Sequence, residues 1–511
     1  MVKRVYSNRI SEYTHENGGR VIILFLLFCV AMYEFITVGL PALAVVCLLP
    51  LFIASFYFTF KWRMSTFWAL IIVNYFVQMK GVFFLPIPIS LPNELLQLLL
   101  IGLAIIDSRE SSHFDRTLNL MLFALIIWCS FCIIEIFNDT CGLGINLATW
   151  YTGARLLAFQ LVYIFIVFTL YITSPEKLMG YLKLWAFLSL FSAIWTWKQQ
   201  SIGLTSAENA FLYGQGQSTH IIQGGTLIRY FSTFSDAANY GCNAAAAAVA
   251  FIIFGITSTI KKEKWLFLII AFFVVFNMFA SGTRTALFCM FGAFAVYLIL
   301  SKSMKIAIPA AIFGLLVYIF LAFTNIANGN QQVRRMRSAF SKNDASSKTR
   351  DINQETMRKY MRDAPWGIGI GMMSANVPAN NKYNLMANIP TDSEYVFIWL
   401  RTGTVGMTVF LITTFMMLFG ACNIVMFKLK SRSLIGIGGG LCCAFVAIQL
   451  GGYANQVLMQ FPNCLTFYGG LSIVYILPYL EPEWIEYEKK QLAKQEEKKR
   501  LKLEKKLAKR V

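Results

Sequence analysis

The sequence predicts an all-α fold: a polytopic membrane helix bundle of about 12–14 transmembrane helices with a long, partly helical loop on one side. Apolar runs of about 20 residues recur along almost the whole chain, and a helix needs that length to cross a bilayer. The chain is 57% hydrophobic and only 14% charged, whereas soluble domains are about 25% charged. The apolar runs are long and unbroken, which excludes a transmembrane β-barrel with its short alternating segments.

Fourteen transmembrane spans are expected from these runs. The fourth and the ninth are short, and 141–152 is compatible with a re-entrant segment, so twelve or thirteen spans remain alternatives. The expected spans are 20–37, 41–60, 65–84, 91–106, 118–137, 152–173, 180–198, 237–258, 265–280, 285–301, 306–324, 395–427, 434–453 and 464–480.

The distribution of Lys and Arg predicts that both termini are cytoplasmic. With the N-terminus inside and the spans alternating, short basic loops such as 261–264 and 428–432 fall on the cytoplasmic side. This placement accounts for the net charge of +19 without a nucleic-acid partner. The basic excess also suits anionic lipids and substrates linked through pyrophosphate. The first apolar run, Val21 to Val38, is too long for a cleaved signal and indicates an uncleaved anchor.

Four parts are expected along the chain. Residues 1–325 form the N-terminal part of the transmembrane bundle, 326–394 an external loop, and 395–480 the C-terminal part of the bundle. The loop 326–394 carries ten Lys/Arg against six Asp/Glu. The remaining part, 481–511, is a cytoplasmic charged helical tail with eleven Lys/Arg and seven Asp/Glu. Such a tail is either a solvated helix or a contact for anionic lipid.

Three arginines in motif-like contexts are predicted on the external face, against the positive-inside trend. The first, Arg229, precedes Asp236 and Asn239 at the start of an Ala-rich span. Asp236 is suited to cap the following helix, and Asn239 to hydrogen-bond inside the bundle. The Arg229 guanidinium either grips a phosphate bidentately or is an interfacial side chain that reaches toward water.

The second arginine lies in a tight turn, Ser281-Gly282-Thr283-Arg284, between two spans. Gly282 permits the turn. A positive side chain at the start of a helix is disfavoured by the helix dipole. The placement of Arg284 makes sense if the helix amides and the guanidinium share a bound anion; an ordinary interfacial arginine is the alternative.

The third arginine, Arg350, begins a helix in the external loop that is expected to run to about Arg362. Ile352, Met357, Tyr360 and Met361 lie roughly on one face, which suits a helix on the membrane surface.

Pro365 ends this helix, and Gly367, Gly369 and Gly371 follow it. A dinucleotide-binding glycine loop must follow a strand in a βαβ unit, and the sequence predicts no such unit here. The spaced glycines indicate a close approach of two backbone segments beside the site.

The loop ends in Thr391-Asp392-Ser393-Glu394-Tyr395, directly before the next span. A carboxylate beside an apolar span is shielded from water and is suited to act as a general base. Both Asp392 and Glu394 are candidates. Helix capping by Asp392 or Ser393, with Glu394 in the first turn, is an alternative that is compatible with catalysis.

No metal site and no cofactor are expected. The three histidines, His15, His113 and His220, are scattered, and the eleven cysteines show no metal-binding spacing. A metal-independent mechanism is therefore favoured.

Taken in order, these motifs resemble the O-antigen ligase and O-antigen polymerase superfamily of bacterial membrane glycosyltransferases. The family pattern has an Arg before Phe-x-Asp-x-x-Asn, a Ser-x-x-Arg turn, and an Arg before Pro-x-Gly-x-Gly-x-Gly. A His-Asn-x-Tyr/Phe stretch and Gly-x-x-Gly close it. The resemblance covers about 229–406, and the family's frequent catalytic histidine falls on Asp392. The matching residues are Arg229, Asp236, Asn239, Ser281, Arg284, Arg350, Pro365, Gly367, Gly369, Gly371, Asp392 to Tyr395, Gly403 and Gly406.

The resemblance implies a glycan donor linked to undecaprenyl pyrophosphate at the periplasmic face of the bacterial inner membrane. It implies that Arg229 and Arg284 hold the pyrophosphate, while Arg350 joins them or orders the loop. Asp392 or Glu394 would take the proton from the acceptor hydroxyl. The acceptor is another lipid-linked glycan in a polymerase, or the lipid A core in a ligase.

A polymerase is slightly favoured, because about fourteen spans and the missing histidine fit that type better. The alternative from another class is a polysaccharide flippase or another multi-span transporter of lipid-linked glycan. A transporter is expected to carry charges near the bilayer midplane and often has two related halves. Here the arginines are predicted at the outer boundary, which favours an enzyme.

Overall fold

The computed structural model describes residues 59–81, 90–106, 113–222, 227–301, 331–337 and 345–507, with short pieces at 19, 26, 28–29, 57, 312, 316, 318–320, 322–326 and 328–329. The chain forms two compact units, Met1–Thr66 and Phe67–Val511. The expected spans 20–37, 41–60 and 306–324 lie wholly or largely outside the described residues. The number of spans in the whole chain therefore stays a prediction.

The regular secondary structure of the described residues is helical apart from one two-stranded hairpin, in which β1 (Ile221–Ile222) pairs antiparallel with β2 (Leu227–Ile228). The α-helices are α4 Arg63–Phe76, α5 Leu91–Ile106, α6 Leu120–Ile134, α7 Leu147–Ala154, α8 Gln160–Tyr171, α9 Pro175–Ser201, α10 Ser206–Tyr213, α11 Gln217–His220, α12 Ala237–Thr257, α13 Lys261–Met278, α14 Thr285–Leu300, α16 Gln331–Arg337, α17 Ala345–Met361, α18 Asn384–Asn388, α19 Glu394–Asn423, α20 Arg432–Ala454 and α21 Gly469–Leu507. Short 3₁₀ or π-helical turns are η2 Phe114–Thr117, η3 Glu135–Phe137, η4 Arg155–Phe159, η5 Phe279–Ser281, η7 Ser374–Asn376, η8 Ile424–Lys428 and η9 Cys464–Tyr468.

Eight helical segments of the described residues are long and apolar enough to cross a bilayer. The predicted polytopic helix bundle is thereby confirmed. The segments are Leu120–Phe137, Leu147–Tyr171, Pro175–Ser201, Ala237–Thr257, Lys261–Ser281, Glu394–Lys428, Arg432–Ala454 and Cys464–Leu501. Two shorter apolar helices, α5 and α14, accompany them.

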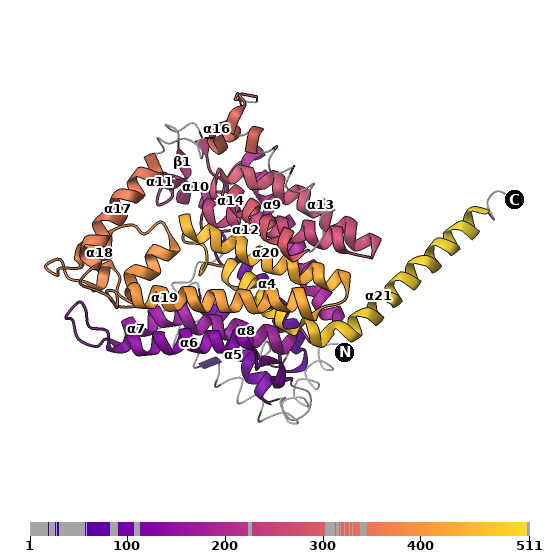
Figure 1. Cartoon of the computed structure of the whole chain (residues 1–511), viewed down its shortest axis with the longest axis horizontal. Coiled ribbons are helices and arrows are strands. Elements are labelled where there is room, and N and C mark those ends of the chain that lie inside the picture. The colour runs from indigo at the N-terminus through magenta and orange to yellow at the C-terminus, as the bar shows by residue number, and fades with distance from the viewer. Residues whose placement is uncertain are drawn as a thin grey trace, which may run out of the picture. The chain divides into compact units, whose positions relative to one another are not determined.

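The centre of the bundle is α12, which packs against α13, α14 and α20 (Figure 1). Its run of alanines from Ala244 to Ala248 is almost wholly buried. On α20, Gly436 lies against Thr257 and Gly440 against Phe254. Small residues on both helices let their backbones approach closely, which is the usual basis of helix packing in membranes.

A second layer pairs α19 with α6, and α5 with α8 (Figure 1). The segment Glu394–Lys428 has 35 residues, which corresponds to roughly 50 Å of helix. A bilayer core is only about 30 Å thick, so part of this segment must project beyond the core or tilt within it. Gly403 interrupts α19 with φ 67° and ψ −168°.

The loop 326–394, which is predicted to be external and is called the external loop below, contributes most of a small core around α17. Met357 and Met361 are 1% and 3% exposed and pack with other buried residues of the loop and with Leu400 of α19. The predicted apolar face of this helix therefore contacts protein at Met357, Tyr360 and Met361, but the prediction is wrong for Ile352, which is exposed. The remaining members of the core are Cys141, Ala364, Ile368, Met372, Val377, Tyr383 and Met386.

Candidate functional site

Arg229 fastens the turn that leads to Arg284. Its Nη2 donates to the Thr283 hydroxyl over 3.0 Å, and its Nε donates to the Ser281 carbonyl over 3.2 Å. A third bond runs from Nη1 to the carbonyl of Thr219 at 2.9 Å. An Arg side chain has five N–H donors, so three of them serve to hold protein segments together. Arg229 and the Arg284 turn thus form one corner of the fold.

Arg284 stands at the start of α14 and is partly exposed. The preceding Gly282 has φ 58°, a left-handed conformation that favours glycine, so the predicted role of this glycine in the turn is confirmed. The next residue, Thr285, is bonded by the side-chain amide of Asn455 at 3.2 Å. The Arg284 turn is therefore fixed on one side by Arg229 and on the other by the segment that follows α20.

Asp236 caps α12, as the sequence predicts. One carboxylate oxygen accepts from the backbone amides of Ala238 and Asn239 at 2.8 and 2.9 Å. The other accepts from the Ser235 hydroxyl at 2.7 Å. Asp236 is thus engaged by the helix start and is suited to position Asn239 rather than to act in chemistry.

Asn239 is fully buried and joins α12 to the segment before η9. Its amide nitrogen donates to the Phe461 carbonyl at 2.9 Å and to Gln460 at 3.1 Å, and its oxygen accepts from Asn463. We call the linked side chains the amide cluster; its members are Gln78, Asn239, Asn243, Gln460 and Asn463. The predicted hydrogen bonding of Asn239 inside the bundle is confirmed.

Residues 455–463, which we call the connecting loop, contact three of the motifs. Asn455 bonds Thr285 beside Arg284, and Gln456 bonds the Thr391 hydroxyl at 2.7 Å. The backbone amide of Leu458 donates to the Glu394 carboxylate at 3.0 Å. Together with the amide cluster, these contacts bring the Arg284 turn, the start of α12 and the Thr391–Tyr395 stretch around one loop.

The two candidate acids differ sharply in exposure. Asp392 is exposed, whereas Glu394 is 3% exposed and bonded to the connecting loop. Ser393 between them is the N-cap of α19, and its hydroxyl donates to the Gly452 carbonyl at 3.1 Å. Tyr395 reaches the Gln449 side chain at 2.9 Å. Of the two carboxylates, Asp392 is thus the one a substrate could reach.

A shallow depression beside Asp392 also involves the external loop. It is lined by Asn353 and Gln354 of α17, together with Met357, Pro390, Thr391, Ser393 and Val396. Arg350 belongs to α17, one helical turn before Gln354. The backbone of α17 therefore brings the Arg350 position near the Asp392 stretch.

The three glycines of the external loop have a packing role. Gly367 and Gly369 have φ of 81° and 111°, and the amides of Ile368 and Gly369 bond the carbonyls of Leu400 and Arg401 at 3.0 and 3.1 Å. A Cβ on Gly367 would collide with the Arg401 backbone. The predicted close backbone approach is confirmed. The segment fills the break in α19 at Gly403.

Gly371 completes this packing on the opposite side. A Cβ on Gly371 would collide with the Thr149 carbonyl of α7, and one on Gly153 would collide with the Ile370 carbonyl. The glycine segment is therefore held between α7 and α19, while the arginine turn is held by the connecting loop.

The sequence did not predict the contacts of two charged or titratable residues near Arg229. His220 accepts from the Ala237 amide at its Nε2 over 3.1 Å, so its proton belongs on Nδ1, near the Gly216 carbonyl at 3.1 Å. Burial, and then the positive charge of Arg229, lowers the pKa of His220 to about 4. The histidine is therefore a neutral partner of the α12 start.

Lys80 is the second such residue, and it follows the end of α4. Its ammonium group lies 3.8 Å from the centre of the Phe211 ring. The negative charge of Asp236 acts on this ammonium group. Lys80 therefore adds a cation to the surroundings of Asp236 and Arg229.

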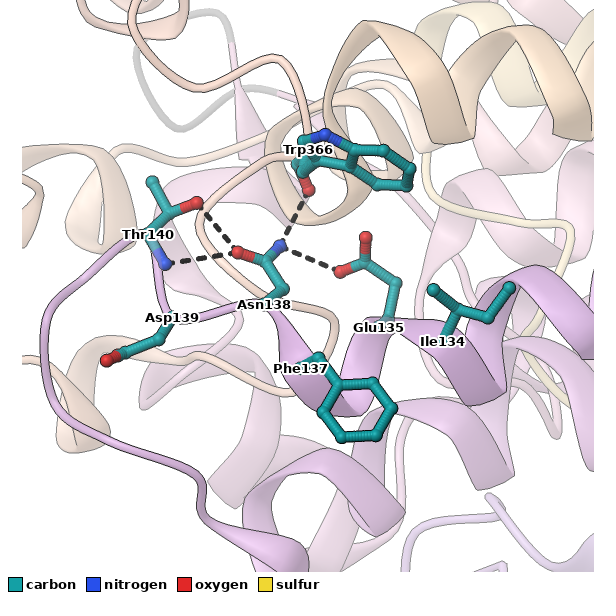
Figure 2. A pocket seen from close by; sticks show the side chains of 7 residues that line it. All are labelled: Ile134, Glu135, Phe137, Asn138, Asp139, Thr140 and Trp366. Carbon is teal, nitrogen blue, oxygen red and sulfur yellow. Dashed lines mark hydrogen bonds between the residues drawn. The ribbon is translucent and has the colours of Figure 1, made fainter.

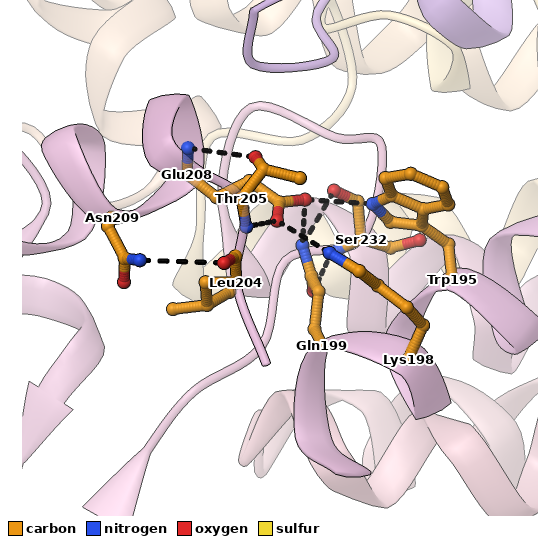
Figure 3. A network of polar contacts seen from close by, with 8 residues as sticks. All are labelled: Trp195, Lys198, Gln199, Leu204, Thr205, Glu208, Asn209 and Ser232. Atoms are coloured by element: carbon orange, nitrogen blue, oxygen red, sulfur yellow. Dashed lines mark hydrogen bonds and ion pairs between the residues drawn. The ribbon is translucent and has the colours of Figure 1, made fainter. Parts of the chain in front are cut away.

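A buried carboxylate network positions the segment between Arg229 and Asp236 (Figure 3). Glu208 is 1% exposed and accepts hydrogen bonds from Trp195 and Gln199, each at 2.8 Å. Burial raises the pKa of Glu208, but hydrogen bonds from Thr205, Gln199 and Trp195 outweigh it and lower that pKa. Gln199 also bonds the backbone nitrogen and oxygen of Ser232, whose φ is 53°. This network fixes the chain just after Arg229.

The connecting loop was missed because it gives little local signal. Its polar residues are neutral amides, and a short stretch of Asn and Gln between two apolar runs is ordinary for a loop. The one available hint was Asn463, an amide at the very start of an apolar run, where a buried polar side chain needs a partner.

Comparison with known families supports the resemblance drawn from the motifs. Residues 266–411 match the model of a protein family described as O-antigen ligase. The match begins in α13 and ends in α19, so it includes the Arg284 turn, the external loop and the Thr391–Tyr395 stretch. The search among curated proteins gave no match.

Proposed function

We propose that this chain, a membrane enzyme of the O-antigen ligase and polymerase superfamily, transfers or polymerises glycan carried on undecaprenyl pyrophosphate. Residues 266–411 match the O-antigen ligase family, which supports a glycosyltransferase-type membrane enzyme acting on lipid-linked glycan. The reaction takes place at the periplasmic face of the bacterial inner membrane, with both termini in the cytoplasm. The surface polysaccharide is O-antigen or a related polymer, and a polymerase is favoured over a ligase.

The observation that carries this proposal is the convergence of the motifs on the connecting loop. The Arg284 turn, Asn239 and the Thr391–Glu394 stretch are far apart in sequence, yet each bonds residues 455–463. Cations and an acid gathered at one end of a membrane bundle are suited to a lipid diphosphate and an attacking hydroxyl.

The arginines bind the pyrophosphate and stabilise the charge that develops on it as it leaves. Donors that are fixed before the reaction need no reorganisation, and such electrostatic stabilisation is often the largest catalytic contribution. The three bonds of Arg229 to its own protein support this fixed geometry. Arg284 extends from the start of α14, where the helix amides add to its attraction for an anion. Lys80 is a third cation for the same group.

Asp392 is the general base, and Glu394 is a positioning residue. Asp392 is exposed, which supports access by the acceptor hydroxyl. Glu394 is buried and holds the backbone of the connecting loop through Leu458. The loop in turn bonds Thr391, next to Asp392. In this assignment the carboxylate nearest the membrane interior orders the site and the outer one accepts the proton.

The transfer step is a direct displacement. The acceptor hydroxyl oxygen forms a bond to the anomeric carbon of the donor, and the bond from that carbon to the pyrophosphate oxygen breaks. The proton of the hydroxyl passes to Asp392, and undecaprenyl pyrophosphate leaves with both electrons of the broken bond. Attack from the opposite face inverts the configuration of the sugar. No metal is assigned to the step.

Arg350 acts from the external loop. The backbone of α17 carries it one turn from Gln354, which borders the depression beside Asp392. We assign it to the ordering of this loop over the site, with a direct contact to the pyrophosphate as the alternative. A lipid tail would enter from the bilayer between helices while the glycan lies under the loop.

The decisive experiment is turnover by the purified protein in lipid nanodiscs, with undecaprenyl-pyrophosphate-linked repeat units as the only substrate. Longer lipid-linked glycan is expected from the wild type and not from Arg284→Ala. A preparation that moves the donor across liposomes but forms no glycosidic bond would indicate a transporter instead. In cells lacking the protein, lipid A core capped with a single repeat indicates a polymerase. Uncapped core with accumulating lipid-linked polymer indicates a ligase.

A further inference from the structure

A cavity of about 320 Å³ lies between the end of α6 and the start of the glycine segment (Figure 2). Its volume is within the range of small-molecule sites, about 300–1,000 Å³. It is built by η3, the residues after it and Trp366, so it lies apart from the arginine turn. Its lining residues are Ile134, Glu135, Phe137, Asn138, Asp139, Thr140 and Trp366.

Glu135 brings a buried acceptor into this cavity. The residue is 3% exposed, and one carboxylate oxygen accepts from the Asn138 amide at 2.8 Å. The other oxygen, Oε1, is buried and has no hydrogen-bond partner among the residues that the structure describes. A buried polar atom without a partner is destabilising, and more so if it is charged. A ligand that donates a hydrogen bond to Oε1 removes this destabilisation.

Asn138 is a positioning residue for the cavity. Its amide nitrogen donates to Glu135 and to the Trp366 carbonyl, each at 2.8 Å. Its oxygen accepts from the backbone and hydroxyl of Thr140 at 3.1 and 2.7 Å. With both ends of its amide engaged, Asn138 ties the carboxylate to the tryptophan segment, as the dashed lines in Figure 2 show. The arrangement is therefore built before any ligand arrives.

Trp366 supplies an aromatic surface beside the carboxylate. One side of its ring stacks on Phe131, with centroids 5.9 Å apart and an interplanar angle of 6°, while 44% of the residue is exposed. A sugar ring has an apolar C–H face and a rim of hydroxyl donors. The apolar face suits an exposed indole, and a hydroxyl suits an unpaired carboxylate oxygen.

The charges of the cavity define the kind of ligand. The lining contains the carboxylates of Glu135 and Asp139, and none of its described residues is Lys or Arg. A phosphate or a uronic acid would be repelled there, whereas the cations of the site lie at the Arg284 turn. A neutral, hydroxyl-bearing sugar avoids this repulsion. The cavity and the arginine turn are thus suited to different parts of one lipid-linked glycan.

The segment that carries Trp366 is bonded to α19, the helix that begins two residues after the candidate base Asp392. Trp366 precedes Gly367, whose neighbours bond Leu400 and Arg401 of α19. The axial distance along α19 from Glu394 to Thr402 is roughly 12 Å, a distance that a short glycan can bridge. A sugar held at Trp366 would therefore fix the position of the rest of its chain relative to Asp392.

We propose that the Glu135–Trp366 cavity binds a neutral sugar unit of the glycan substrate, with Glu135 Oε1 accepting a hydroxyl hydrogen bond and Trp366 packing on the sugar ring. The proposal rests on the proposed glycosyltransferase function. The sugar belongs either to the donor or to the acceptor, and both sources share this chemistry.

The first test is binding to the purified full-length protein in nanodiscs. The probes are the lipid-free repeat-unit oligosaccharide, released from the donor by mild acid, and undecaprenyl pyrophosphate without sugar. Glu135→Gln keeps an oxygen for Asn138 but turns an N–H donor toward the cavity. This variant and Trp366→Ala are expected to weaken oligosaccharide binding about tenfold or more, while undecaprenyl pyrophosphate binding is unchanged.

Two exposed residues outside the cavity provide matched controls. Glu176→Gln at the start of α9 repeats the isosteric change, and Trp265→Ala on α13 repeats the loss of an exposed indole. Both are expected to bind each probe like the wild type. Oligosaccharide binding at the wild-type level in well-folded Glu135→Gln and Trp366→Ala would overturn the proposal.

Turnover separates the two sources of the sugar. The lipid-free oligosaccharide has no pyrophosphate and can serve only as acceptor. A raised KM for it in Glu135→Gln assigns the cavity to the acceptor, and a raised KM for the lipid-linked donor alone assigns it to the donor. Unchanged KM values for both overturn the cavity assignment. Failure of the glycosyltransferase function appears differently, as a wild-type protein that forms no glycosidic bond from either substrate.

Discussion

The guanidinium of Arg229 donates to the hydroxyl of Thr283, 3.0 Å away and one residue before Arg284. Two arginines that lie 55 positions apart in the chain therefore share one turn, and one of them has a structural task besides any contact with substrate. Their substitution is expected to have different consequences.

Arg284→Ala is expected to abolish glycan formation with little change in thermal stability, because the side chain extends from the partly exposed start of α14. Arg229→Ala is expected to lose activity and also about 1–3 kcal/mol of stability, because it removes three hydrogen bonds. Product gels and unfolding of the purified proteins in detergent measure both effects. Full-length glycan from a normally expressed Arg284→Ala protein would contradict the pyrophosphate assignment.

Asp392→Asn is expected to lower kcat by about 10²–10⁴-fold while donor binding and folding persist, because a general base contributes an acceleration of that order. Glu394→Gln is expected to lower stability as well, since Glu394 is buried against the connecting loop. The measurements are single-turnover rates at saturating donor, donor binding and thermal unfolding. If Asp392→Asn turns over normally and Glu394→Gln is folded but inactive, the base is Glu394.

Acid is expected to loosen the start of α12 through His220. The pKa of His220 is about 4 in the folded protein, compared with 6.5 as its ordinary value. The unfolded chain therefore binds more protons between these values. This contribution to stability is fully present above pH 6.5 and is lost as the pH falls toward 4, at a total of about 3 kcal/mol.

The measurement for His220 is the free energy of unfolding of detergent-solubilised protein between pH 7.5 and 4. His220→Gln is expected to flatten this profile, while His113→Gln should keep the wild-type slope. A His220→Gln protein whose stability falls with acid as steeply as the wild type would refute the assignment.

Gly403→Ala is expected to destabilise the protein by about 1–3 kcal/mol or more. Gly403 has a left-handed φ of 67°, and a Cβ there would collide with the Pro365 carbonyl. Gly102→Ala in α5 is the control, since its Cβ meets no described atom within 4 Å and alanine favours a helix by about 1 kcal/mol. The unfolding temperature is therefore expected to fall for Gly403→Ala and to rise for Gly102→Ala. Equal effects would show that the break in α19 is not required.

The features that the sequence predicted well depend on neighbouring residues. Asp236 and Ser393 are caps because their side chains reach amides two or three positions ahead. The role of Gly282 could be predicted because a tight turn between two spans has few possible backbone conformations. Such relationships are contained in a short stretch and do not depend on the rest of the fold.

The features that it missed depend on distant partners. Asn463 bonds Asn239, which lies 224 positions away in the chain. The residues next to either amide do not indicate this contact. Glu135 is a single carboxylate at the end of a span, so its contact with Trp366 through Asn138 exists only after folding. For α17, the apolar face around Met357 was predicted, but its partner is the loop core rather than the membrane surface.

The amide cluster has one more consequence. Gln78, Asn239, Asn243, Gln460 and Asn463 carry no ionisable group, so no gain or loss of a proton alters the hydrogen bonds within this cluster. Acidification acts on His220 at the start of α12 but adds no charge to the amide cluster. The hydrogen bonds of the cluster therefore keep the same donors and acceptors in acid, whereas those of the neighbouring His220 do not.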